Sequence, residues 1–335
     1  MSRLTRLAAA ATATVALTVL ASGPTVAGEP TVTDPRVVAH FDFAAGQTPE
    51  NIVVGPDGSA YVTFAFARQV ARVDKNGDTR ILATLPVVEN PMTPVIGMAA
   101  AMGITRAHDG TLYVTYATGT SETGVWRVDP DGGAPVRIAQ LPADGFPNAL
   151  ALDETSEARW GSPRPEAGGG TLYVADSVHG TVWSVPRQGG TPTAWATGAA
   201  LQPLAPPAGL GVGANGLKFH NGAVRVSNTD RQTLLRIPVR ADETAGPVET
   251  RATGLTWIDD FGFTGKGDTV LAALIMSDDV TLVRPDGTQE IVLTEQDGLS
   301  NPTSVAVRGK TVYVTSASFF KQVPDPNLLL ATPKG

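Results

Sequence analysis

The sequence predicts an all-β fold, a six-bladed β-propeller with four-stranded antiparallel blades. Of its 335 residues, 36 are Gly and 26 are Pro, and only 17% are charged, which is typical of short strands joined by tight turns. One strand phrase, in which apolar and polar residues alternate, also recurs six times along the chain. A β-sandwich would not explain six copies in one register, so a closed ring of repeats is expected.

The recurring phrase is clearest in three copies, each with Tyr-Val at its centre. These copies occupy residues 59–64, 111–116 and 171–176, and weaker copies occupy residues 223–228, 269–274 and 311–316. Each copy follows a turn signal such as Pro56-Asp57-Gly58. Gly and Asn supply the positive φ that hairpin turns need, so each copy is the second strand of a hairpin.

Further predicted strands surround each copy of the phrase. An inner strand precedes the turn, as at residues 52–54, and a third strand follows the phrase, as at residues 70–74. A fourth strand follows in most units, whereas the last unit lacks a recognisable outer strand after Ser316. Residues 37–43 form an additional strand before the first unit. We expect this strand to complete the sixth blade and close the ring, which removes exposed sheet edges.

The N-terminus has the pattern of a secretory signal peptide. Arg3 and Arg6 precede an uncharged run over residues 7–21, and small residues at Thr25 and Ala27 suit cleavage near Ala27. The run is shorter than the roughly 20 residues that span a bilayer, which disfavours a membrane anchor. We expect a protein secreted to the extracellular, periplasmic or cell-wall side, with residues 28–335 forming one propeller domain.

Composition narrows the classes of partner and chemistry. The net charge is −7, and it becomes more negative if the signal peptide is removed, so nucleic acid and anionic membranes are poor partners. The absence of Cys excludes a disulfide scaffold, a thiol nucleophile and a Cys-based zinc site. No G-x-S-x-G elbow, P-loop or dinucleotide fingerprint is present. A monomer that binds a small molecule and contacts no membrane is the expected form.

The inner strands predict a site rich in oxygen. Because these strands line the central channel of a propeller, residues at equivalent positions near their starts converge on the axis. The residues two before the first apolar member of each inner strand are Glu50, Met102, Asn148, Asn215, Asp259 and Thr303. Four of the six offer carboxylate or amide oxygens and two are negative, which suits one divalent cation, with Ca²⁺ expected and Zn²⁺, Mn²⁺ or Mg²⁺ as alternatives.

Two other interpretations of these positions stay open. Asn and Asp are also ordinary turn residues before strands. A register shift of one residue would place Asp260 at the site in place of Asp259.

Three phrases of the sequence resemble the regucalcin-like, or senescence-marker-protein/gluconolactonase, family. They are Pro49–Val54, Asn215-Gly216-Leu217 and Asp259-Asp260-Phe261. The resemblance implies a six-bladed propeller and a metal-dependent hydrolase, typically a lactonase, with a related branch that hydrolyses organophosphates. It also implies Glu50, Asn215 and Asp259 as metal ligands, with Asn148 in contact with the substrate or the metal. The family's usual Glu-Gly-Pro entrance reads Glu50-Asn51-Ile52 here, and its substrate-binding Arg has no clear counterpart.

The resulting prediction is a secreted metal-dependent hydrolase that acts on a lactone, ester or phosphoester. Asp259 would be both a metal ligand and the general base or nucleophile. Asn148, Met102, Thr303 and His179 are the predicted substrate contacts, His179 because it lies in a loop expected to open on the metal face. The alternatives are a non-catalytic propeller with a structural cation that binds a ligand or protein, and a propeller lyase.

Two long connections are expected to border the channel mouth. They cover residues 86–101 and 198–214, and each leads into an inner strand that carries a predicted site residue. The second is rich in Pro, Leu and Ala, so its backbone is restricted and its side chains suit an apolar part of a substrate. We expect residues 198–214 to govern substrate choice.

Overall fold

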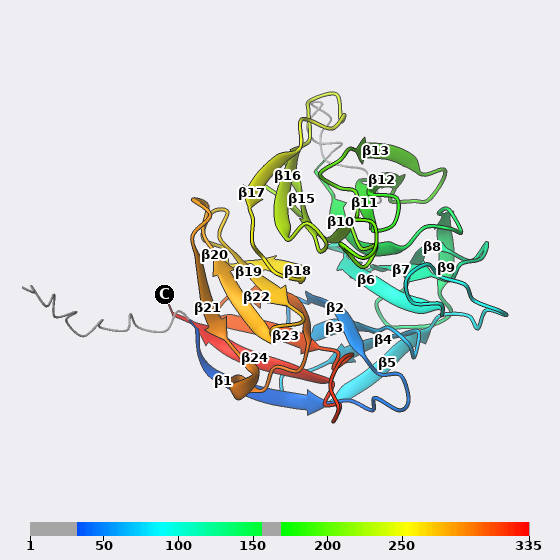
Figure 1. Ribbon diagram of the computed structural model, residues 1–335. Helices are drawn as coiled ribbons and strands as arrows, with labels where there is room; N and C mark the ends of the chain where they lie inside the picture. Colours follow the sequence, from blue (N-terminus) through cyan, green and yellow to red (C-terminus); the bar gives the residue numbers. More distant parts are fainter. Residues whose placement is uncertain (1–31, 156–168, 335) are drawn as a thin grey trace, which may run out of the picture. The chain divides into compact units, whose positions relative to one another are not determined.

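The computed structural model describes residues 32–155 and 169–334, which form a ring of six antiparallel sheets (Figure 1). Every sheet has four strands, and the first strands of neighbouring sheets contact one another round the ring. The helical structure described is a 3-10 turn, η2 (Glu295–Asp297). The predicted six-bladed propeller is therefore confirmed.

The first three sheets each follow the chain from the innermost strand outward. The first contains β2 (Pro49–Val54), β3 (Ala60–Phe64), β4 (Gln69–Val73) and β5 (Thr79–Thr84). The second contains β6 (Ala100–Arg106), β7 (Leu112–Ala117), β8 (Gly124–Val128) and β9 (Val136–Gln140). The third contains β10 (Pro147–Asp153), β11 (Thr171–Asp176), β12 (Thr181–Pro186) and β13 (Thr193–Thr197).

The last three sheets include one that joins distant parts of the chain. The fourth contains β14 (Ala214–His220), β15 (Ala223–Asn228), β16 (Thr233–Pro238) and β17 (Glu249–Ala252). The fifth contains β18 (Ile258–Phe263), β19 (Val270–Leu274), β20 (Asp279–Val283) and β21 (Gln289–Leu293). The sixth contains β22 (Pro302–Arg308), β23 (Thr311–Ser316), β24 (Asn327–Pro333) and β1 (Val32–His40), and β1 pairs antiparallel with β24 as the outermost strand.

The hydrophobic core lies between adjacent sheets. Alternation along β3 sends neighbouring side chains to opposite sides: Tyr61 packs against the second sheet, with Ile104, whereas Val62 packs against the sixth, with Tyr313. Equivalent buried clusters fill the other interfaces round the ring. Both faces of each sheet are thus buried, which explains why the second strands are buried at nearly every position, polar residues included.

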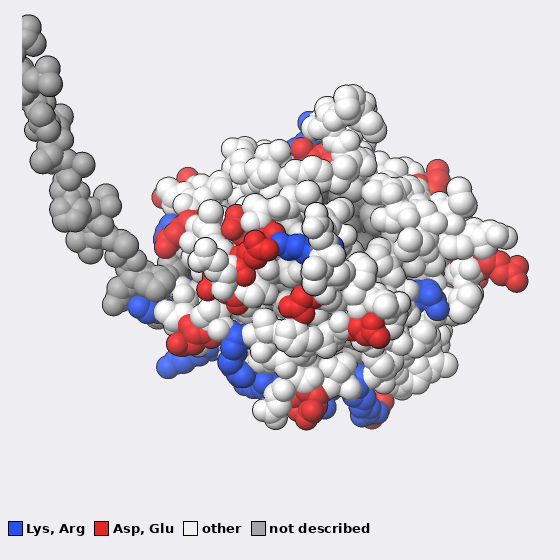
Figure 2. All heavy atoms as spheres, turned by 60° about the horizontal axis from the view of Figure 1, so that its bottom comes forward, with Lys and Arg blue, Asp and Glu red and all other residues white. Residues whose placement is uncertain are grey.

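Surface charge is sparse, in line with the composition. On the face in Figure 2, basic and acidic side chains are interspersed between larger uncharged areas. No helix among the described residues combines the length and apolarity needed to cross a membrane. Residues 1–27, the predicted signal peptide, lie outside the described residues, so the signal peptide and the domain division stay predictions.

Candidate active site

Each innermost strand carries a β-bulge at the register of the predicted site. In the first sheet the pairing shifts between Pro49 and Ile52, so Glu50 and Asn51 lie opposite Thr63 alone. A bulge breaks the alternation of a strand and redirects side chains, which is why bulges recur beside active sites. Equivalent shifts in the other five sheets surround Met102, Asn148, Asn215, Asp259 and Thr303.

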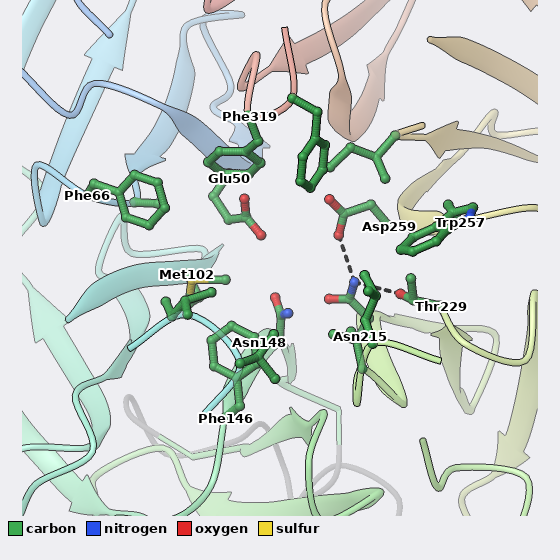
Figure 3. A pocket seen from close by; sticks show the side chains of 17 residues that line it. Glu50, Phe66, Met102, Phe146, Asn148, Asn215, Thr229, Trp257, Asp259 and Phe319 are labelled. Carbon is green, nitrogen blue, oxygen red and sulfur yellow. Dashed lines mark hydrogen bonds between the residues drawn. The ribbon is translucent and has the colours of Figure 1, made fainter. Parts of the chain in front are cut away.

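Four of the predicted residues line one cavity of about 300 Å³. They are Glu50, Asn148, Asn215 and Asp259, from the first, third, fourth and fifth sheets. Figure 3 shows their carboxylate and amide groups pointing toward a common point. All four side chains are buried. The structure therefore brings together the residues that the sequence predicts as metal ligands.

Hydrogen bonds fix the Asn215 side chain through its amide nitrogen. Nδ2 donates to Asp259 Oδ1 at 2.8 Å and to Thr229 Oγ1 at 2.9 Å. The Thr229 hydroxyl in turn donates to the backbone carbonyl of Ile258 at 2.7 Å. Because the nitrogen is occupied, the orientation of the amide is set and its oxygen is left as a free acceptor.

Two buried oxygens of the site have no hydrogen-bond donor among the described residues. They are Glu50 Oε2 and Asn215 Oδ1. Nearly all buried polar groups in proteins are hydrogen-bonded, so two such acceptors in one cavity point to a ligand that accepts their lone pairs. With Asp259 and Asn148 they form an all-oxygen donor set of two carboxylates and two amides, which fits a hard divalent cation such as Ca²⁺.

The amides are an essential part of this donor set. Within the described ranges, no group of three or more His, Cys, Asp or Glu side chains is arranged to hold a metal ion. The candidate site is thus unlike the His- and Cys-rich sites that Zn²⁺ favours.

The two carboxylates repel each other in the buried site. Burial and the negative charge of Asp260 raise the pKa of Glu50 to about 8. Burial, and then the charges of Glu50 and Asp260, raise the pKa of Asp259 well above its usual value, although Asn215 and Lys218 oppose this. A cation between the carboxylates favours their ionised forms, so its binding is expected to release protons.

Asp260 is turned away from the cavity. Its Oδ2 accepts hydrogen bonds from Asn51 Nδ2 at 2.9 Å and Ser304 Oγ at 2.7 Å, and it forms an ion pair with Lys218. Asp260 does not line the cavity, whereas Asp259 does. Of the two registers considered from the sequence, the one with Asp259 at the site is therefore observed.

The cavity wall above these polar groups is apolar. Twelve of the 17 residues that line the cavity are apolar, and several surround the polar groups in Figure 3. The aromatic members are Phe66, Phe146, Trp257, Phe319 and Phe320. None of the lining residues within the described part of the chain is Lys, Arg or His.

Both long connections contribute to this wall, as predicted. Val95 lies in the connection between β5 and β6, and Leu210 and Val212 lie in the connection between β13 and β14. Val95 has φ 71° and Trp257 has φ 56°, left-handed conformations that cost on the order of 1–3 kcal/mol for such residues. Strained backbone of this kind clusters at ligand sites, where surrounding contacts enforce it.

Asp230 holds the second connection in place. Its carboxylate accepts backbone N–H bonds from Leu204 at 3.0 Å, Leu210 at 2.9 Å and Val212 at 3.1 Å. The connection is therefore an ordered wall and not a loose loop.

The structure corrects two of the four predicted substrate contacts. Met102 and Asn148 line the cavity, but Thr303 and His179 do not. The Thr303 hydroxyl is fully buried and donates to the Pro49 carbonyl at 2.8 Å, so it joins the sixth sheet to the first. His179 Nδ1 lies 2.8 Å from Asp176 Oδ2, which holds the ring outside the cavity.

Three hydroxyls that sequence reasoning missed fix the backbone of the site. They belong to Thr63, Thr115 and Ser227, the fifth residues of their copies of the strand phrase. Each hydroxyl accepts a hydrogen bond from the N–H of a bulge residue in its own sheet. It also donates to a backbone carbonyl in the next sheet, which belongs to Met102 for Thr63, to Asn148 for Thr115 and to Asp259 for Ser227. The recurrence of Thr or Ser at the fifth position of the phrase was the sequence signal that could have indicated these hydroxyls.

Comparisons with known proteins identify related folds. No family model matches the chain, and no curated protein matches it. Among solved structures, the calcium-binding protein regucalcin from Agrobacterium tumefaciens aligns with a TM-score of 0.62 and 15% identity, over 90% of this chain and 96% of that one. A gluconolactonase from Xanthomonas campestris aligns with a TM-score of 0.60 and 14% identity, over 91% and 97%.

A third match carries a different named activity. Virginiamycin B lyase from Staphylococcus aureus aligns with a TM-score of 0.57 and 12% identity, over 89% of this chain and 98% of that one. At such identities the likeness is one of fold. The chain therefore shares the six-bladed propeller of regucalcin and the gluconolactonases, the proteins whose family its sequence resembles.

Proposed function

We propose that this protein is a lactonase-like hydrolase that uses one divalent cation, Ca²⁺ by preference, to open a lactone or ester. The observation that carries the proposal is the pair of buried acceptors without donors, Glu50 Oε2 and Asn215 Oδ1, beside Asp259 in a cavity of small-molecule size. The solved structures support it, because they include a calcium-binding protein and a gluconolactonase.

The side chains have distinct roles in this proposal. Glu50, Asn148, Asn215 and Asp259 would hold the cation, which supplies Lewis acidity toward a carbonyl oxygen. Asn215 Nδ2 donates a hydrogen bond to Asp259 Oδ1 and keeps it in place. No described residue donates a hydrogen bond to the other oxygen, Asp259 Oδ2. Oδ2 is thus available to take a proton from an attacking water.

The reaction balances with water as the second substrate. The water oxygen bonds to the carbonyl carbon, and the acyl C–O bond of the ring or ester breaks. The proton held at Asp259 passes to the departing alkoxide oxygen, which leaves a carboxylic acid and an alcohol. The acid then ionises by releasing the second proton of the water to solvent.

A lyase has less support. A variant of virginiamycin B lyase in which a histidine is replaced by alanine is described as catalytically inactive. None of the described residues lining the present cavity is a histidine, and His179 lies outside it. Cation binding without turnover of any lactone or ester would favour the non-catalytic alternative.

The direct test is hydrolysis of a panel of lactones and esters with added Ca²⁺ and after chelation. We expect Asp259→Asn to lower kcat by about 100-fold or more, since it removes the base, and to keep the melting temperature close to that of the parent. Asp286→Asn, in an exposed turn between β20 and β21, is the matched control and should retain parental turnover. Turnover that survives both chelation and the Asp259 change would overturn the proposal.

We further propose that the protein acts outside the cytoplasm as a monomer. The charged and apolar pattern of residues 3–21 and the small residues before Gly28 support export. A mature chain beginning near Gly28 in the culture medium, of monomeric mass, is the expected finding. A full-length chain retained in the cytoplasm, or a stable oligomer, would contradict it.

A further inference from the structure

We infer that the cavity selects a neutral lactone that carries an alkyl or aryl group, and that it discriminates against polyhydroxylated and anionic substrates. This inference rests on the proposed hydrolase function and specifies its substrate class. It draws on three features of the cavity: the missing cationic side chains, the occupied hydrogen-bonding groups and the continuous apolar wall.

The first feature is the charge of the cavity lining. Glu50 and Asp259 are its ionisable residues, and none of the described residues that line it is Lys, Arg or His. A phosphate or carboxylate on the substrate would therefore meet two negative side chains and no protein cation. Such an anionic group could bind only to the metal, where it would compete with the carbonyl oxygen that has to react.

The second feature is the shortage of free hydrogen-bonding groups on the wall. Thr229 is the hydroxyl residue that lines the cavity, and it already donates to Ile258 and accepts from Asn215. The Asn215 nitrogen is likewise occupied. Apart from the oxygens proposed to hold the cation and the side-chain amide of Asn148, the lining offers no free partner for the several hydroxyls of a sugar lactone. Burying those hydroxyls here is unfavourable, whereas burying an alkyl or aryl group is not.

The third feature is an apolar path from the cavity to solvent. Val95, Leu210 and Phe320 all line the cavity, yet their residues are 51%, 48% and 58% exposed. They come from three different connections, which precede β6, β14 and β24. Single exposed apolar residues are common, but three around one opening provide a surface for a substituent longer than the cavity.

The test compares lactones that share one reacting ring. At saturating Ca²⁺ the full chain is assayed with γ-butyrolactone, with γ-lactones bearing four-carbon and eight-carbon chains, and with glucono-δ-lactone. We expect kcat/KM to rise up to about fourfold for each methylene that becomes buried. Glucono-δ-lactone should be the poorest substrate. A flat response to chain length, or a preference for the sugar lactone, would overturn the inference.

Paired variants locate the effect on the wall. Leu210→Ser should lower kcat/KM for the four-carbon lactone by about tenfold and change that for γ-butyrolactone by less than twofold, because only the chain contacts Leu210. Val323→Ser is the control, since Val323 is 84% exposed in the connection before β24 but does not line the cavity. Equal losses on both lactones, or equal effects of the two variants, would show that the wall does not select.

A binding measurement separates this inference from the proposed function. The matching γ-lactams serve as unreactive probes, and their binding is followed by the fluorescence of Trp257, which lines the cavity. Tighter binding of longer-chain lactams without turnover of any lactone would support the apolar selectivity and overturn the hydrolase. Turnover that favours the sugar lactone would support the hydrolase and overturn the selectivity.

Discussion

Thr229 illustrates how a residue that is not itself a candidate ligand can determine the geometry of the site. Its hydroxyl accepts from Asn215 Nδ2 and donates to the Ile258 carbonyl, so it distinguishes the two ends of the Asn215 amide. With the nitrogen held there, the oxygen is directed to the position proposed for the cation. Removing a residue that is hydrogen-bonded to a metal ligand commonly lowers metal affinity by about 10–100-fold.

We therefore expect Thr229→Val to weaken Ca²⁺ binding by about tenfold, because the amide loses the acceptor that orients it. Isothermal titration calorimetry on the chelated and dialysed protein measures this. Thr229→Ser keeps the hydroxyl and should restore most of the affinity. Equal affinities in the Val and Ser variants would mean that Thr229 only packs.

At the scale of the strand, the bulges and the hydroxyl bridges determine where the site lies. A bulge recurs at the same register in every inner strand, and in β18 it separates Asp259, which lines the cavity, from the next residue, Asp260, which does not. The Thr115 hydroxyl then ties such a bulge to the neighbouring sheet, since it accepts from Gly103 N–H and donates to the Asn148 carbonyl.

Thr115→Val tests this bridge because the two side chains have nearly the same shape. The substitution leaves a buried N–H and a buried carbonyl without their partner, each worth about 1–3 kcal/mol. We expect the free energy of unfolding to fall by about 2 kcal/mol or more in urea titrations. Thr115→Ser retains the hydroxyl and should lose less than half as much, and a larger loss in Ser than in Val would contradict the bridge.

Sequence reasoning located the site register because the inner strands repeat their apolar pairs. It failed for Thr303, where the register is right but the hydroxyl bonds to Pro49 of the next sheet instead of entering the cavity. Such a contact depends on the neighbouring sheet and leaves no periodic trace. The apolar wall was not predicted in detail for the same reason. Phe319 and Ile275, for example, belong to loops that are distant in the sequence and come together only when the ring closes.

At the scale of the molecule, the repeated phrase was enough to predict the ring but not all of its strands. β24 (Asn327–Pro333) was missed because residues 328–331 form a short continuous apolar run, without the turn and the alternation that mark the other strands. In the structure it is the third strand of the sixth sheet, between β23 and β1. A strand buried on both faces resembles any apolar segment until its neighbours are known.

The stability of the whole ring should depend on pH when the cation is removed. The pKa of Glu50 is raised from 4.5 to about 8, so the folded state binds a proton that the unfolded state releases between these values. Stability is thus lost as the pH rises through this window, because the unfolded state binds fewer protons there. Asp259, whose pKa is also raised, acts in the same direction.

We expect the melting temperature of the chelated protein to fall between pH 6 and pH 8.5, and Ca²⁺ to restore it most at the alkaline end. Circular dichroism melts with chelator or with Ca²⁺ measure both effects. Glu50→Gln should flatten the pH dependence of the chelated protein. A chelated protein that becomes more stable toward pH 8.5 would contradict this account.

The lack of cationic side chains on the described cavity lining also bears on how a reaction there would finish. Opening a neutral lactone creates a carboxylate inside a space already bordered by Glu50 and Asp259. The new anion is repelled by both, and no arginine or lysine of the lining holds it back. Among the described lining residues and the proposed cation, the cation alone would attract the new acid. Release of the product would therefore depend on how strongly the cation holds the carboxylate, and a cation bound more loosely would free the product faster.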